Sequence, residues 1–140
     1  METFSVKLRV WNPAQPQEIA EFDIPVDAHS TFSWISRERL ERLGINPCRK
    51  MGFHLKRGFV VEEDIAAVYL EIDGRTIGDV VVMAEAGEPE LIGAHTLNGL
   101  GMVADLVQKR LVPAEMWALS SLGFGLPETG AKNSEVLARS

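Results

Sequence analysis

An alternating run of apolar and polar residues that ends at a single aspartate constrains this chain more than any other feature. Ala20, Phe22, Ile24 and Val26 recur at every second position, the period of a β-strand with one buried face. Asp27 follows directly, so it ends a strand and opens a loop, where catalytic and binding side chains are often found. The pattern predicts β-structure and makes Asp27 the first candidate functional residue.

A short helix is predicted after this loop, at about residues 36 to 43. Either Ser33 or Ser36 can cap its N-terminus, and the segment SRERLERLG contains two oppositely charged pairs at i,i+4 spacing, which stabilise an exposed helix. Gly44 is placed to end the helix, because glycine readily adopts the left-handed backbone conformation found there.

A second segment repeats this layout. The apolar pair at residues 91–92 leads into GAHTLNGLGM, so that residues 93–95 stand where residues 27–29 stood. The leucine and glycine spacing at the end of both segments also matches, and both an internal structural duplication and coincidence in a leucine-rich helix end remain open. A second short helix is expected at about 96 to 101, with Thr96 as its cap and His95 in the preceding loop.

The remaining apolar segments predict a mainly antiparallel β-protein. MGFHL and FVVEEDIAAVYLEI flank a turn at residues 56–58, and the Asp-Gly pair at residues 73–74 is a short-hairpin signal. Residues 80–83 form a continuous apolar run, which indicates a strand buried on both faces. Residues 102–113 are predicted to form two short strands around the turn at residues 108–110.

Taken together, these segments resemble the retropepsin-like aspartic peptidase family, in particular its small bacterial members. In that family a strand ends in Asp-Thr-Gly-Ala, and a later apolar pair plus glycine opens a short helix that closes on Leu-Gly. The matching residues here are Val26, Asp27 and Ser30 in the first motif and Leu91, Ile92, Gly93, Thr96, Leu97, Leu100 and Gly101 in the second. The resemblance covers roughly residues 20 to 113. It implies a small closed antiparallel β-barrel of the acid protease type with one or two short helices.

The same resemblance implies an aspartic endopeptidase that acts on a polypeptide as a homodimer. This class uses two carboxylates that share one proton, so a chain with one Asp motif must dimerise to supply both. The implied catalytic residue is Asp27, whose carboxylate would activate a water molecule. The segment FHLKRGFVVEED resembles the family's hairpin flap, with Lys56, Arg57 and Gly58 at its tip for substrate binding.

One departure from the family falls within the catalytic motif. Asp-Thr-Gly has become Asp27-Ala28-His29, followed by Ser30. In the family the threonine hydroxyl holds the two catalytic loops together across the dimer, and Ala28 has no hydroxyl. His29 places an imidazole where glycine permits close approach. The alternatives are therefore a degenerate family member that binds extended peptide or has a structural role, and an unrelated β-protein whose Asp27 forms an Asx-turn.

Metal binding is a further chemistry that the histidines permit. Asp27 and His29 are able to supply two ligands, with His54 or His95 as a third. No HExxH or paired-cysteine pattern accompanies these residues. We therefore expect neither a metal nor another cofactor.

Composition bounds the remaining possibilities. A chain of 140 residues with 46% hydrophobic content is long enough for one domain with a real core. We expect this domain at 1–125 and a flexible tail at 126–140, while the apolar residues between 114 and 125 either form the dimer contact or cover the domain's own barrel end. The net charge of −6 disfavours binding to nucleic acid or to anionic membranes.

No membrane partner is expected, because no apolar run reaches the ~20 residues of a membrane-spanning helix. The first eleven residues alternate as a strand does, whereas a signal peptide has a continuous apolar core. The sequence therefore predicts a cytoplasmic protein whose partners are a peptide and a second copy of itself.

Overall fold

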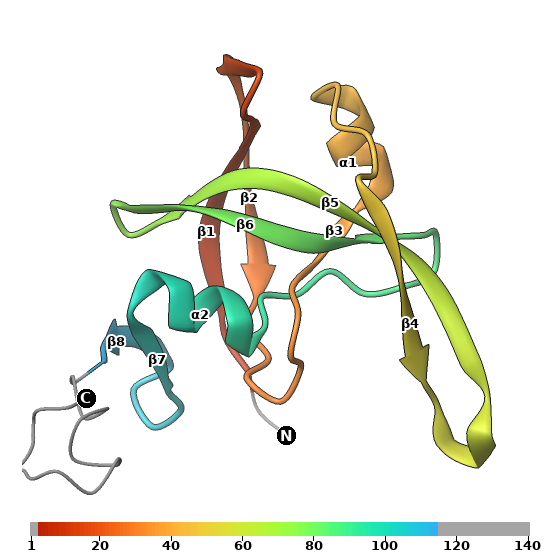
Figure 1. Cartoon of the computed structure of the whole chain (residues 1–140). Coiled ribbons are helices and arrows are strands. Elements are labelled where there is room, and N and C mark those ends of the chain that lie inside the picture. The colour runs from red at the N-terminus through yellow and green to blue at the C-terminus, as the bar shows by residue number, and fades with distance from the viewer. Residues whose placement is uncertain (1–2, 115–140) are drawn as a thin grey trace, which may run out of the picture.

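The computed structural model describes residues 3–114. Its strands are β1 (Ser5–Asn12), β2 (Gln15–Pro25), β3 (Trp34–Ser36), β4 (Arg49–His54), β5 (Val60–Ile72), β6 (Arg75–Ala84), β7 (Met102–Asp105) and β8 (Arg110–Pro113). Its helices are α1 (Arg37–Arg42), α2 (Ala94–Leu100) and the one-turn 3-10 helix η1 (Lys56–Gly58). The protein is mainly β, as the alternating patterns predicted (Figure 1).

Six strands form one sheet in the order β2-β1-β5-β6-β3, with β4 paired to β5 beside this path. The pairs are antiparallel except for β3 with β6, and β7 and β8 form a separate antiparallel pair. The strands at the two ends of this order, β2 and β3, are linked through residues 91 and 92 by two isolated bridges. Trp34 of β3 pairs with Leu91, and Val26, directly after β2, pairs with Ile92.

The period of two predicted from residues 20 to 26 is confirmed. Ile24 and Val26 are buried, whereas Glu21 and Asp23 are exposed. One face of the β1–β2 hairpin thus contributes to a core that also receives side chains from β5, β6 and both α-helices. The largest side chains buried in this core are Leu8, Ile24, Ile35, Leu40, Leu70, Ile72, Met83 and Ile92.

Helix α1 begins and ends as predicted. Ser36 is its N-cap and accepts a hydrogen bond from the Arg39 N–H at 3.4 Å, and both i,i+4 ion pairs form. Gly44 follows the helix with φ of +75°. Of the two proposed caps, Ser36 holds this position, and Ser33 is buried elsewhere.

Helix α2 starts earlier than predicted. Its N-cap is Gly93, so His95 lies in the first turn and the expectation of Thr96 as the cap is wrong. The difference has a tertiary cause, because Thr96 is fully buried and its hydroxyl binds other side chains of the interior. Gly101 ends the helix with φ of +70°, as a left-handed C-cap.

The predicted hairpins are present. Asp73 and Gly74 join β5 to β6 with φ of +53° and +80°, the signs that a two-residue type I′ turn requires. Hairpin β4–β5 carries η1 at its tip, where Arg57 and Gly58 also have positive φ. Figure 1 shows this hairpin extending away from the sheet, on the side opposite β7 and β8. Of the continuous apolar run at residues 80–83 in β6, which predicted burial on both faces, residues 81–83 are buried and Val80 is half-buried.

Some predictions fall outside the described residues: the domain limit at 125, the tail at 126–140 and the dimer contact after residue 114. Within residues 3–114, no helix has the length and apolar character needed to span a membrane.

Candidate active site

The two predicted motifs lie side by side. The Asp27 N–H donates to the Ile92 carbonyl at 2.9 Å, and the Ile92 N–H donates to the Pro25 carbonyl at 2.8 Å. The Asp27 carboxylate accepts the His29 N–H on Oδ1 at 3.0 Å, which closes an Asx-turn. The carboxylate is thus held at a strand end by backbone contacts, and its side chain is 45% exposed.

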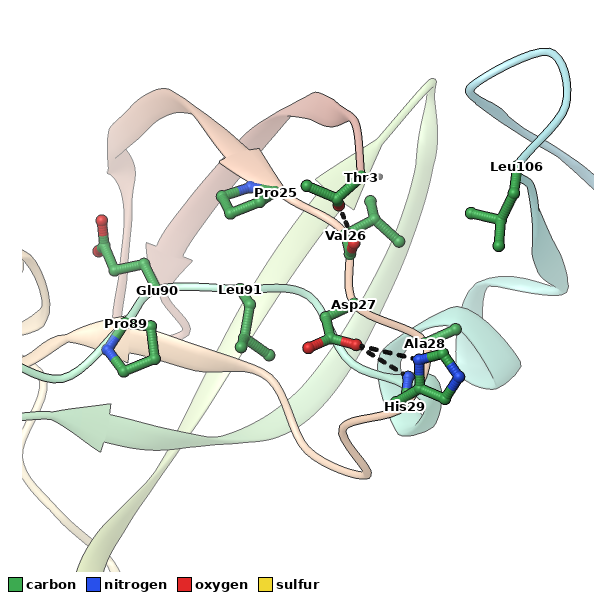
Figure 2. Close-up of a pocket in the computed structure, with 10 residues that line it drawn as sticks. All are labelled: Thr3, Pro25, Val26, Asp27, Ala28, His29, Pro89, Glu90, Leu91 and Leu106. Carbon is green, nitrogen blue, oxygen red and sulfur yellow. Dashed lines mark hydrogen bonds and ion pairs between the residues drawn. The ribbon is translucent and has the colours of Figure 1, made fainter. Parts of the chain in front are cut away.

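Asp27 faces a pocket of about 260 Å³ (Figure 2). The walls come from the end of β2, the loop that follows it, the segment before α2, the N-terminus and the turn between β7 and β8. The lining residues are Thr3, Pro25, Val26, Asp27, Ala28, His29, Pro89, Glu90, Leu91 and Leu106. Most of this wall is apolar, and Asp27 places a carboxylate within it.

Ala28 and His29 line this pocket beside Asp27. The His29 Nδ1 atom lies 3.7 Å from Asp27 Oδ1, and the imidazole is 70% exposed. Figure 2 shows the ring next to the carboxylate, in space that a glycine would leave open. The altered motif therefore adds a second titratable group at the site.

Ser30 supports the loop and does not line the pocket. Its N–H donates to the Asp27 carbonyl at 3.1 Å, and its hydroxyl donates to the Phe32 carbonyl at 2.8 Å. Its own carbonyl accepts the Ala94 N–H at 2.7 Å. Gly93 comes so close to this loop that an added Cβ would lie 2.4 Å from the Phe32 oxygen. The loop after Asp27 is therefore packed directly on the start of α2.

No protein-family model and no curated protein matches the sequence. Among solved structures, the chain is similar to EIAV protease complexed with the inhibitor HBY-793, with a TM-score of 0.53 and 18% sequence identity over 71% of this chain and 89% of that one. The chain has a retropepsin-like fold. The predicted fold class is confirmed, and the similarity at this identity concerns the fold alone.

Sequence reasoning missed one residue of this retropepsin-like fold, Asp79 of β6. Its side chain is 1% exposed, and its carboxylate accepts the Thr96 hydroxyl at 2.6 Å, the Val80 N–H at 2.9 Å and His95 Nδ1 at 3.1 Å. The signal available in the sequence was an acid directly before the continuous apolar run at residues 80–83. The predicted roles of His95 and Thr96 are replaced by contacts to this carboxylate.

Arg57 and Gly58, at the tip of the β4–β5 hairpin, do not line the Asp27 pocket. Beside this tip, Leu55 and Phe59 are largely exposed. An exposed apolar hairpin is suited to cover an extended ligand, and the substrate-binding role of the tip stays a prediction.

Metal binding has little support in the described part of the chain, where no group of three or more His, Cys, Asp or Glu side chains is arranged to hold an ion. His95 is bound to Asp79, and His54 lies on an exposed position of β4. Asp27 and His29 thus form a pair without the third ligand that the sequence suggested.

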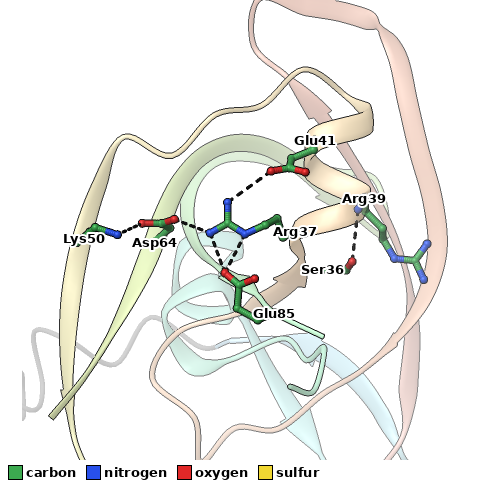
Figure 3. A network of polar contacts seen from close by, with 7 residues as sticks. All are labelled: Ser36, Arg37, Arg39, Glu41, Lys50, Asp64 and Glu85. Atoms are coloured by element: carbon green, nitrogen blue, oxygen red, sulfur yellow. Dashed lines mark hydrogen bonds and ion pairs between the residues drawn. The ribbon is translucent and has the colours of Figure 1, made fainter. Parts of the chain in front are cut away.

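A charged cluster joins the base of the β4–β5 hairpin to α1 (Figure 3). The Arg37 guanidinium contacts Asp64 and, at 2.8 Å, Glu85, and Lys50 contacts Asp64 at 2.8 Å. Hydrogen bonds from Lys50 and Arg37 hold the pKa of the Asp64 carboxyl below its usual value. The cluster therefore ties the hairpin to α1 and to the residues directly after β6 with charged contacts.

Glu63 lies beside this cluster and is buried. Burial, a hydrogen bond with Glu88 and the neighbouring charges of Glu88, Glu85 and Asp64 together raise the pKa of Glu63 to about 7. A carboxyl group in such surroundings favours its neutral form.

Proposed function

We propose that this protein is an aspartic endopeptidase that acts as a homodimer. The observation that carries the proposal is the placement of Asp27, whose half-exposed carboxylate stands in a pocket wall and is oriented by the His29 N–H. One chain supplies one such carboxylate, and the reaction needs two. A second copy would provide the other.

In the proposed reaction, one Asp27 carboxylate takes a proton from a water molecule while the protonated Asp27 of the partner polarises the peptide carbonyl. The pair holds one proton because two like charges a few ångströms apart cannot both ionise at low cost. Mildly acidic pH favours this singly protonated state. The apolar pocket walls around Asp27, which include Leu91 and Leu106, would contact apolar side chains of an extended peptide.

A second candidate function is favoured by Ala28 and His29. Ala28 cannot provide the hydroxyl support that the resemblance associates with catalysis, and the His29 imidazole stands 3.7 Å from the carboxylate. A degenerate member with this site would bind an extended peptide by strand addition without cleaving it, or would serve a structural role.

Peptide cleavage by the wild type and Asp27→Asn tests the proposal. A diverse peptide library is incubated with each protein between about pH 4 and 7, where such a pair shares one proton, and products are read by mass spectrometry. We expect products from the wild type that Asp27→Asn does not form. Asp23→Asn, which changes an exposed acid of β2, the strand that leads to Asp27, is the matched control and should retain cleavage.

Two other outcomes decide between the candidates. Equal cleavage by Asp27→Asn would mean that a contaminant or another mechanism is responsible. No products at any pH, from protein shown to be a folded dimer, would overturn the peptidase proposal and favour the peptide-binding or structural role.

A further inference from the structure

Asp79 is a buried carboxylate that the proposed reaction does not use. Its side chain is 1% exposed and accepts three hydrogen bonds, from the Thr96 hydroxyl, the Val80 N–H and His95 Nδ1. A buried charge is costly unless it is hydrogen-bonded. The three donors therefore explain how the Asp79 carboxylate can be buried in the core. Two of them, His95 and Thr96, belong to the first turn of α2.

In the chain of hydrogen bonds that links Gly93, Ser33, Thr96 and Asp79, every bond is donated toward Asp79. A carboxylate only accepts, so the Thr96 hydroxyl must give its one proton to Asp79. The Ser33 hydroxyl, 2.5 Å from Thr96 Oγ1, therefore donates to Thr96. Ser33 Oγ is then free to accept the Gly93 N–H at 2.9 Å. The buried charge thus orders a chain of bonds that ends on the backbone in front of α2.

The same helix turn holds the loop that begins at Asp27. The Ala94 N–H donates to the Ser30 carbonyl at 2.7 Å, and the His95 N–H donates to the Thr31 carbonyl at 2.8 Å. The His95 ring also lies against Phe32 of this loop, with ring centroids 5.6 Å apart. Any shift of the first turn of α2 would therefore move the loop.

We propose that Asp79 is a positioning residue for Asp27. It fixes the first turn of α2 through Thr96 and His95, and that turn holds the loop on which the Asp27 carboxylate is mounted. Ala28 has no hydroxyl with which to support this loop, so the support described here comes from within the chain. The catalytic consequence of this role rests on the proposed function, whereas its effect on the loop does not.

Asp79→Asn tests the inference with almost no change in volume. An amide nitrogen facing Thr96 would donate where the carboxylate accepted, so the Thr96 proton would turn toward Ser33 and the order of the chain would be reversed. We expect the amides of Asp27, Ser30, Ala94 and His95 to exchange hydrogen about 10- to 100-fold faster, the range for losing a hydrogen bond to a charged group. Amides of β1 and β2 should keep their wild-type rates.

Asp64→Asn is the matched control, because it removes a well-paired carboxylate that contacts Lys50 and Arg37 and neither the loop nor α2. It should leave exchange at the four loop and helix amides unchanged. In protein that cleaves peptides, Asp79→Asn should lower kcat by about 10-fold or more with little change in KM, as expected for a misplaced catalytic group. Asp64→Asn should leave both kcat and KM unaltered.

Wild-type exchange at these amides in folded Asp79→Asn would overturn the inference. If Asp79→Asn does not fold, Thr96→Val removes one hydroxyl at similar volume and is expected to give the same local pattern, and unchanged exchange would again overturn the inference. Faster loop exchange in protein without peptidase activity would support the positioning of the loop while the proposed function fails. Asp27-dependent cleavage by the wild type, together with unaltered exchange in Asp79→Asn, would support the proposed function and overturn the positioning role of Asp79.

Discussion

The backbone N–H of Asp27 donates a hydrogen bond to the carbonyl oxygen of Ile92 at 2.9 Å. This bond joins the end of β2 to the segment that leads into α2. The first residue of the candidate catalytic loop is therefore set by a segment distant in sequence. A shift of the backbone at the start of α2 should consequently displace Asp27.

Gly93→Ala should destabilise the protein. An added Cβ would lie 2.4 Å from the Phe32 oxygen and 2.7 Å from the Ser30 oxygen, both backbone atoms that cannot move without displacing the loop. We expect the free energy of unfolding to fall by about 1–3 kcal/mol, the usual cost of overpacking, as measured by urea denaturation. Gly78→Ala is the control, since its Cβ would meet the Tyr69 ring at 3.2 Å; equal losses for both variants would contradict the steric account.

Asp64→Asn should reduce stability at neutral pH more than at low pH. Hydrogen bonds from Lys50 and Arg37 lower the pKa of Asp64 in the folded protein, so the folded state binds this proton less tightly than the unfolded state does. The stabilisation is present above the unfolded pKa and is lost as pH falls through the folded pKa. Urea denaturation of both proteins across the acidic range measures the difference, and a difference that stays constant down to low pH would refute this linkage.

The strands and turns could be predicted because their causes are local. One buried face produces the alternation at residues 20 to 26, and the left-handed turn between β5 and β6 favours Asp73 and Gly74. The Ser36 cap likewise depends on the backbone a few residues ahead. Each of these features is set by near neighbours in the chain.

The interior of the site could not be predicted in the same way. Thr96 resembles a helix cap in sequence, yet its hydroxyl serves Asp79 of β6, and only the folded sheet brings the two together. Ser33 had the same local pattern as Ser36 and is buried against Thr96. The burial of a polar side chain depends on partners elsewhere in the fold, which local patterns do not contain.

Replacing Ala28 and His29 by the Thr-Gly of the retropepsin motif should raise the proposed peptidase activity. Ala28→Thr with His29→Gly supplies a hydroxyl to support the loop and removes an imidazole 3.7 Å from the Asp27 carboxylate. Since misplacement of a catalytic group by about 1 Å can cost about 100-fold, we expect kcat/KM for a peptide cleaved by the wild type to rise. The same double change combined with Asp27→Asn is the control and should be inactive; a double variant no faster than the wild type would show that the altered motif does not limit the rate.

Glu63 should make the protein less stable as pH rises. Burial and the neighbouring Glu88 raise its pKa in the folded protein from 4.5 to about 7, so between these values the folded state holds a proton that the unfolded state has lost. The free energy of unfolding contributed by Glu63 therefore decreases with rising pH across this window. Glu63→Gln stays neutral and should remove the decrease, which urea denaturation at pH 4.5 and above pH 7 measures, with Glu62→Gln on the exposed face of the same strand as the control. If Glu63→Gln retained the wild-type pH dependence, the decrease would have to arise from other groups, and the neutral form of Glu63 would not contribute to holding the hairpin against residues 85–88.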